Sequence, residues 1–244
     1  MKKICLIIQY NGKNFCGWQK QIGKRTVQGV LEHKISKLLK EEISLFASGR
    51  TDAGVHATGQ TAHFGTNSKF DLSKLPFAVN SGLENDVSIL KAKEVSQNFH
   101  ARYSVKKKTY IYKIYVSKIK KPLKNGLVTQ VIYDLDISKM KQATKYFVGE
   151  HNFFAFCSSG SSVKDFVRII YDFKIKKVDD EIHLKISGNG FLYNMVRIIV
   201  GTLIDIGRGK IKPEEIVNII KSKDRKKAGE TMPAHGLYLC KVSY

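Results

Sequence analysis

Several features that mark common protein classes are scarce in this sequence or missing from it. Cysteine occurs only as Cys5, Cys16, Cys157 and Cys240, and no two of these are spaced as a CxxC pair. Disulfide frameworks and structural zinc sites both need cysteines at characteristic short spacings, so neither is expected. The scattered thiols are instead typical of a reducing cytoplasm, which is the predicted location.

Long hydrophobic runs are also missing. The longest lies near residues 198–206, is interrupted by Gly201 and Asp205, and follows Arg197 directly. It is far shorter than the roughly 18 residues that a membrane span needs. The N-terminal apolar stretch Ile4–Ile8 is too short for a signal peptide and leads to no small-residue cleavage site. No membrane partner is therefore predicted.

Most catalytic and metal-binding signatures are absent as well. Residues 12–17 have the spacing of a phosphate-binding loop, but Trp18 and Gln19 stand where that loop needs Lys and Ser or Thr. The sequence contains no GxGxxG, no HExxH and no zinc-deaminase motif. His56 and His63 are expected to serve a turn or the core. We therefore predict no metal site.

Acidic residues are half as frequent as basic ones. Lys and Arg number 42 against 21 Asp and Glu, so the formal net charge is +21. The excess is +7 before residue 105 and +14 after it, so no single tail carries it. With 43% hydrophobic residues the chain is expected to fold, and its charge favours a polyanionic partner such as a nucleic acid. Generic solubility, or a genome rich in A and T that inflates lysine, is the alternative.

The hydrophobic pattern predicts an α+β fold, with helices packed on a mainly antiparallel sheet. We divide the chain into 1–105 and 106–244, each with strands and helices. Residues 158–162 are expected to form a mobile loop. The expected strands are 3–10, 87–95, 109–117, 167–178, 181–187 and 237–243, and the expected helices are 27–39, 71–82, 189–207 and those starting after Asp136 and at Pro213.

The segment Ser48-Gly-Arg-Thr-Asp-Ala-Gly-Val-His-Ala57 is the most informative in the first part. Arg50 and Asp52 are two residues apart, so on an extended segment their side chains lie on the same side. The flanking glycines allow positive φ and close approach of another chain. A carboxylate and a guanidinium can then face one cleft. A surface turn with an ion pair explains the same residues, and composition alone slightly favours that alternative.

Arg197 lies within a predicted helix that otherwise has the composition of a buried one. An unpaired buried charge is costly, so a carboxylate from elsewhere in the chain would be its natural partner. The alternative is that Arg197 extends to the surface from the edge of the helix.

A run of lysines precedes two tyrosines where the second part begins. Lys106, Lys107 and Lys108 precede Tyr110 and Tyr112 on a predicted strand. Lysines beside an aromatic strand suit neutralisation of a nucleic-acid backbone together with base stacking. Tyrosines that pack across a sheet are the alternative, and at least one of the two is expected in the core.

At this point the residues resemble the bacterial tRNA pseudouridine synthases of the TruA type. Nearly the whole chain matches in the expected order. Thr61 replaces a residue that is usually apolar, and residues 118–133 match weakly. The motifs that carry the resemblance are Tyr10-Asn-Gly, Phe15-x-Gly-Trp-Gln19, Gly49-Arg-Thr-Asp-Ala-Gly-Val-His-Ala57, Gly59-Gln60, Phe99-His-Ala-Arg102, Tyr110-x-Tyr112, Gly149-Glu-His-x-Phe153-x-x-Phe156, Met195-Val-Arg-x-Ile-Val-Gly201 and Gly236-Leu-Tyr-Leu239.

The resemblance implies a fold of two related α+β halves with a central basic cleft. It also implies a homodimer that acts on tRNA, without metal or organic cofactor, and converts uridine to pseudouridine at positions 38–40 of the anticodon stem-loop. Asp52 matches the essential aspartate, Arg50 the base-displacing arginine, Tyr110 the stacking tyrosine and Arg197 the arginine paired with the aspartate.

Two other functions stay open on the sequence alone. The same chemistry can act on another tRNA site or on ribosomal RNA, since diffuse contacts to shape and charge decide specificity. A non-catalytic RNA-binding protein or chaperone can keep the fold, although the intact Arg50, Asp52, Tyr110 and Arg197 argue against it.

Overall fold

The computed structural model describes residues 1–160 and 163–244; residues 161 and 162, the end of the expected mobile loop, lie outside them. The chain forms two compact units. The first comprises Met1–Lys106 and Tyr238–Tyr244, and the second Lys107–Leu237. The sequence placed residues 237–244 in the second part. The last strand joins the first unit instead because Tyr238 and Leu239 pair with His56 and Ala57.

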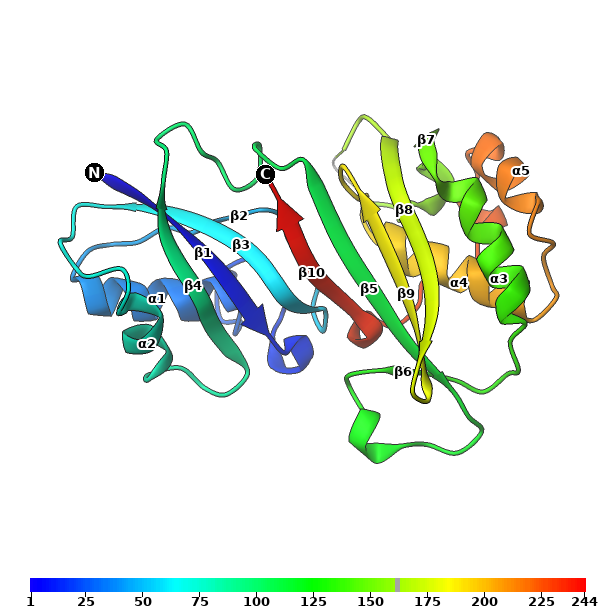
Figure 1. Cartoon of the computed structure of the whole chain (residues 1–244), viewed down its shortest axis with the longest axis horizontal. Coiled ribbons are helices and arrows are strands. Elements are labelled where there is room, and N and C mark those ends of the chain that lie inside the picture. The colour runs from blue at the N-terminus through cyan, green and yellow to red at the C-terminus, as the bar shows by residue number, and fades with distance from the viewer. Residues whose placement is uncertain (161–162) are drawn as a thin grey trace. The chain divides into compact units, whose positions relative to one another are not determined.

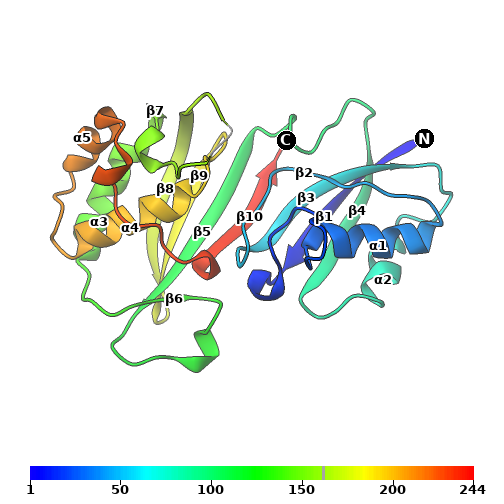
Figure 2. The ribbon, with the colours of Figure 1, turned by 180° about the vertical axis from the view of Figure 1, so that it is seen from behind.

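The first unit is built on a sheet in the order β4-β1-β3-β10 (Figure 1). β1 is antiparallel to β3 and β4, and β10 is parallel to β3. The two-residue strand β2 is antiparallel to β3. Helices α1 and α2 cover one face of this sheet, as the view from behind shows (Figure 2). The elements are β1 (Lys2–Tyr10), α1 (Val27–Leu39), β2 (Phe46–Ala47), β3 (His56–Thr66), α2 (Leu75–Asn80), β4 (Val87–Val95) and β10 (Leu237–Ser243).

Local sequence explains why α1 begins where it does. The Thr26 hydroxyl accepts a hydrogen bond from Gly29 N at 3.3 Å, which satisfies one of the free amides of the first turn. Val27, Leu31 and Ile35 recur at helical spacing and are fully buried. Burial of this apolar stripe fixes the helix on its sheet. The helix predicted at 27–39 is confirmed.

The second unit has an antiparallel sheet in the order β5-β9-β8-β7, with β6 parallel to β5. Helix α4 contacts β5 and α3, and α3 contacts β8. The elements are β5 (Lys107–Val116), β6 (Thr129–Val131), α3 (Ile137–Thr144), β7 (Gly149–Asn152), β8 (Val167–Val178), β9 (Glu181–Gly188), α4 (Met195–Gly207) and α5 (Glu215–Ser222). The predicted α+β class, with a mixed and mainly antiparallel sheet flanked by helices, is confirmed.

Helix α4 begins later than predicted, at Met195 rather than at Asn189. Asn194 has φ = 59°, a left-handed conformation that an α-helix does not accommodate. Asn189 instead continues the pairing of β9 with β8, since its backbone N–H donates to Ile169 O at 3.0 Å and its side chain accepts from Ile169 N at 2.9 Å. Among the described residues, none of the helices has the length and hydrophobicity to cross a membrane.

Candidate functional site

The segment with Arg50 and Asp52 connects β2 to β3 and ends in a tight turn. Val55 N donates to Asp52 O at 3.1 Å, and Gly54 has φ = +80°. This hydrogen bond and this glycine are those of a type II turn, in which the third position needs positive φ. Arg50 is exposed and Asp52 is half-buried. The turn therefore fixes the backbone of Asp52 while Arg50 remains accessible to solvent.

The end of β1 and the loop that follows it contact Thr51, the residue between Arg50 and Asp52. Trp18 N donates to Thr51 O at 3.0 Å, and the Tyr10 and Thr51 hydroxyls are hydrogen-bonded at 2.7 Å. Burial raises the pKa of Tyr10, so its hydroxyl keeps its proton. Gly17 has φ = +83°, and a Cβ there would lie 2.7 Å from Thr51 O. The motif around residues 15–19 thus supports the residue next to Asp52.

Val55 and His56, which follow Asp52, pack closely against Gly12. A Cβ on Gly12 would lie 2.1 Å from Val55 O, so only glycine allows the two loops to meet. Gly12 N donates to His56 Nδ1 at 3.0 Å, and the His56 ring stacks on Tyr238 at 4.5 Å between centroids. His56 is 1% exposed. The expected core role of this histidine is confirmed.

Gln60 holds the other end of the segment, a role that the sequence analysis missed. Its side chain is fully buried, accepts from Ser48 Oγ at 2.7 Å and donates to Gly49 O at 3.0 Å. Ser48 N also donates to Thr61 O at 2.7 Å. A buried amide with both ends used fixes local geometry. The adjacency of Gly59 and Gln60 was visible in the sequence, but it gave no indication of this contact.

Arg25 supports the loop of residues 11–18 from outside. Its guanidinium donates to both carboxylate oxygens of Asp86 at 2.8 and 2.9 Å and lies 4.1 Å from the centroid of the Phe15 ring. The bond to Asp86 raises the pKa of Arg25. Bidentate pairs are directional as well as strong. Arg25 and Asp86 are 61 residues apart, so no local signal could have revealed this pair.

Tyr110 and Tyr112 differ in their surroundings on β5. Tyr110 is half-buried and meets Phe191 edge-on at 5.1 Å between ring centroids. Tyr112 is fully buried, and its hydroxyl donates to Pro233 O at 2.7 Å. The expectation that at least one of the two belongs to the core is confirmed for Tyr112. Lys106 and Lys107 are exposed and Lys108 is half-buried.

Arg197 is half-buried on the first turn of α4. Its Nε donates to Met232 O at 2.5 Å and its Nη1 to Asn194 Oδ1 at 2.7 Å. The Asn194 amide nitrogen in turn donates to Ser158 Oγ at 3.0 Å. Burial and the charge of Arg197 lower the pKa of His235. The guanidinium is thus oriented within the second unit by a carbonyl and an amide oxygen.

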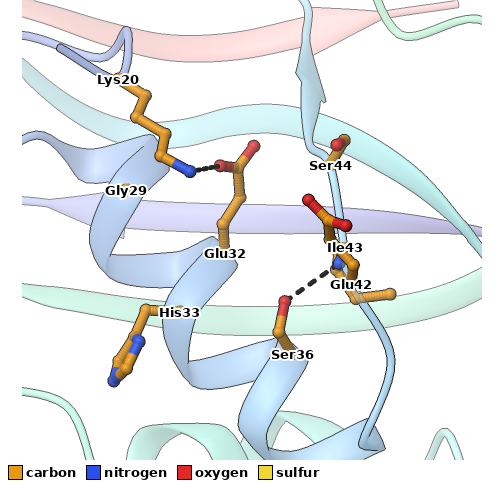
Figure 3. Close-up of a pocket in the computed structure, with 8 residues that line it drawn as sticks. All are labelled: Lys20, Gly29, Glu32, His33, Ser36, Glu42, Ile43 and Ser44. Atoms are coloured by element: carbon orange, nitrogen blue, oxygen red, sulfur yellow. Dashed lines mark hydrogen bonds and ion pairs between the residues drawn. The ribbon is translucent and has the colours of Figure 1, made fainter. Parts of the chain in front are cut away.

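The described residues also contain a pocket that holds none of the predicted site residues (Figure 3). Glu32, buried beside it, accepts hydrogen bonds from Leu45 N at 2.9 Å and Gln28 at 2.8 Å, and lies 3.4 Å from Lys20 Nζ. These contacts tie the segment before β2 to α1. The pocket is lined by Lys20, Gly29, Glu32, His33, Ser36, Glu42, Ile43 and Ser44.

Metal-ligating side chains do not gather in the part of the chain that the structure describes: no three of its His, Cys, Asp and Glu residues are placed to share an ion. His63 is 4% exposed, and its Nδ1 accepts a hydrogen bond from Ala101 N at 3.1 Å. Its expected role in the core is confirmed.

Comparisons with known proteins place the chain in a family. A family model described as tRNA pseudouridine synthase matches residues 6–104 and 143–244. The tRNA pseudouridine synthase A of Caldicellulosiruptor saccharolyticus is 51% identical over 244 residues, which cover all of both chains. The protein of that name from Thermoanaerobacter sp. is 48% identical, again over both full lengths, and that from Bacillus pumilus is 43% identical over 99% of each.

The chain belongs to the tRNA pseudouridine synthase family. The resemblance drawn from the motifs is therefore confirmed, as is the predicted class of enzyme, an isomerase of tRNA uridine. The matched ranges of this synthase family include Arg50, Asp52 and Arg197. Tyr110 and the three lysines lie in the stretch between the two ranges, so the assignment of Tyr110 rests on its motif and that of the lysines on their charge beside an aromatic strand.

Proposed function

We propose that this synthase acts in the cytoplasm, as a homodimer, on uridines 38–40 of the tRNA anticodon stem-loop. The observation that carries the proposal is full-length similarity to relatives named tRNA pseudouridine synthase A, over ranges that include the Asp52 loop. The loop itself is held by Tyr10, Trp18 and Gln60, as a catalytic carboxylate requires.

The proposed reaction is an internal rearrangement. The bond between N1 of uracil and C1′ of ribose breaks, the base turns, and C5 bonds to C1′. The proton on C5 leaves and N1, which carries no hydrogen in uridine, takes up a proton, so atoms and electrons balance without an oxidant or reductant. The chemistry therefore needs no cofactor. Asp52 acts in its ionised form, as nucleophile or as base at the sugar.

Other residues make the uridine available and keep the free base in place. A stacked base must leave the helix first, at a cost of a few kcal/mol. Arg50, exposed beside Asp52, fills the vacated space. Tyr110 stacks on the uracil, because a detached base that escapes gives hydrolysis instead of isomerisation. Arg197 is the proposed ion-pair partner of Asp52 and keeps the aspartate ionised.

Lys106, Lys107 and Lys108 are proposed to contact tRNA phosphates. They contribute three of the 42 basic residues, and two of them are exposed. Each phosphate contact releases counterions, which gives binding a characteristic dependence on salt.

Pseudouridine mapping of cellular RNA, with and without this gene, tests the proposal. Loss of pseudouridine at positions 38–40 of tRNA is the expected result, and re-expression of the intact chain restores it. Loss at another tRNA site or in ribosomal RNA would assign the same chemistry to a different substrate. An unchanged map would leave a non-catalytic RNA-binding protein.

A further inference from the structure

Aromatic rings and a guanidinium, most of them exposed, gather on the first unit, on segments separate from the Asp52 loop. They belong to Phe46 of β2 and to His100, Arg102 and Tyr103 of the segment that follows β4; we call these four residues the aromatic platform. Phe46 is 52% exposed and Tyr103 is 77% exposed. An exposed cluster of large rings is unusual for a folded domain and marks an interaction surface.

The rings of the platform are connected through a buried histidine. Phe46 stacks on His63, with centroids 5.3 Å apart and planes 27° from parallel. His63 meets His100 edge-on at 4.7 Å, and His100 lies 4.4 Å from Tyr103 at 32°. A continuous series of ring contacts therefore supports both exposed rings from beneath.

The backbone of the platform is fixed by hydrogen bonds. Ala101, which is fully buried, donates its N–H to His63 Nδ1 at 3.1 Å and accepts from Tyr244 OH at 2.9 Å. His100 Nδ1 accepts from Arg102 N at 3.1 Å. A surface that is already ordered loses little conformational entropy when a ligand binds.

The sequence around the platform carries charge of one sign. Residues 95–133 contain no Asp or Glu and nine Lys or Arg. The Arg102 guanidinium carbon lies 5.7 Å from the centroid of the Tyr103 ring. Burial lowers the pKa of His63 to about 4 and also lowers that of His100, so both rings are uncharged at neutral pH. The platform thus combines neutral π faces with a neighbouring cation, as single-stranded nucleic-acid sites do.

We propose that the aromatic platform binds an unpaired nucleotide of the tRNA, with the base stacked on Tyr103 and its phosphate beside Arg102. Stacking on a ring tolerates any base, so the platform adds affinity and orientation rather than sequence selection. The identity of the RNA rests on the proposed function; the stacking surface is a separate claim. Arg102 and the absence of Asp and Glu from residues 95–106 disfavour a basic protein partner.

Binding of an unmodified tRNA transcript to four variants of the full chain tests this proposal. Tyr103→Ala and Tyr103→Leu should each weaken binding about tenfold, because neither side chain has a π face. Tyr103→Phe should bind as the parent chain does. Phe77→Ala is the matched control, since Phe77 on α2 is 81% exposed in the same unit and its removal should change nothing. Circular dichroism establishes that each variant is folded.

Two outcomes would contradict the proposal that a base stacks on Tyr103. If stacking occurs, Tyr103→Ala binds more weakly than Phe77→Ala, and equal affinities exclude it. Tyr103→Leu with the affinity of Tyr103→Phe would show apolar packing, as against a protein, rather than stacking on a base. Both comparisons are made with unmodified tRNA and need no turnover, so they are independent of whether pseudouridine forms at positions 38–40.

Discussion

At the scale of single residues, Gly12 allows the loop of residues 11–18 to pack against the turn that carries Asp52. The Gly12 hydrogens face Val55 O, and a methyl group there must displace the carbonyl. Gly12→Ala should lower the free energy of unfolding by about 1–3 kcal/mol, as overpacked sites do. It should also slow pseudouridine formation, since Val55 O belongs to the turn that carries Asp52.

Urea unfolding and single-turnover assays measure both effects of Gly12→Ala. Gly82→Ala is the matched control, because its Cβ would meet only the flexible end of Lys34. Equal stabilities for the two variants would show that the contact with Val55 imposes no constraint.

Burial of His63 is predicted to make the stability of the folded protein depend on pH. Burial, together with the charges of His100 and Lys3, lowers the pKa of His63 to about 4 from the ordinary 6.5. The unfolded chain then takes up this proton before the folded chain does, so stability is full above about pH 6.5 and is lost as the pH falls towards 4. We expect a loss on the order of 2 kcal/mol over this range.

The control for this prediction replaces an exposed histidine of the same unit instead of the buried one. Denaturant unfolding at several pH values should show a weaker pH dependence in His63→Gln and an unchanged one in His33→Gln, because His33 is exposed. If both variants kept the parent slope, the acid sensitivity would have another source.

The sequence identified site residues only where a local motif contained them. Arg50 and Asp52 stand out because two glycines flank them in one short segment. Gln60 and the pair of Arg25 and Asp86 were missed, since what defines each is a contact with a residue distant in the chain or a burial that no short pattern encodes. Composition could not show which tyrosine was core, because both lie on one face of β5 and differ only in their neighbours, Phe191 beside Tyr110 and Pro233 beside Tyr112.

At the scale of elements, helix α4 and the segment of residues 229–232 must approach closely to orient Arg197. A Cβ on Gly201 would lie 2.0 Å from Glu230 O, and Met232 O accepts from Arg197 Nε. Gly201→Ala should therefore move the acceptor away from the guanidinium. We expect a destabilisation of about 1–3 kcal/mol and a larger drop in kcat than in tRNA affinity.

Steady-state kinetics and tRNA binding separate these effects of Gly201→Ala. Gly190→Ala serves as the control in the same unit, because its Cβ would make an ordinary 3.5 Å contact with Arg168. A variant of Gly201 with weaker affinity but an unchanged kcat would place this segment in RNA binding instead.

Elements with strong periodicity and clear caps were predictable from the sequence. Thr26 and Asp136 both cap helices as expected, and β4 has the predicted bounds. The predicted start of α4 was wrong because apolar residues also occupy positions 191–193, before the helix. The irregular segment ends at Asn194, whose backbone is left-handed, and the helix begins after it. Periodicity records burial, and burial alone does not distinguish a loop packed on a sheet from the first turn of a helix.

At the scale of the whole molecule, the net charge of +21 predicts tRNA binding that weakens steeply with salt. Replacing Lys106, Lys107 and Lys108 together by Ala should weaken binding. The logarithmic salt dependence should also become shallower, by about one unit for each phosphate that the variant no longer neutralises. Electrophoretic mobility shifts over a range of salt concentrations provide both quantities.

The control for the lysine cluster removes the same charge elsewhere. Lys221, Lys223 and Lys226, which are all exposed, lie on and after α5. Their triple replacement by Ala should leave affinity and salt slope close to those of the parent chain. Equal weakening by both triple variants would mean that only total charge matters.

The division into units shows what the sequence could and could not provide at this scale. The first boundary was placed at residue 105, and the structure places it at Lys106. The return of β10 to the first unit was missed, because pairing with β3 joins residues about 180 positions apart and leaves no local pattern.

Tritium release from tRNA labelled at C5 of uridine tests most directly whether Asp52 carries the reaction. Asp52→Asn keeps the size of the side chain but removes its charge, so we expect unchanged tRNA binding and no release. Asp71→Asn, which changes an exposed carboxylate in the same unit, should release tritium as the parent chain does. Substantial release by Asp52→Asn would contradict the account, since the isomerisation would then proceed without its proposed carboxylate.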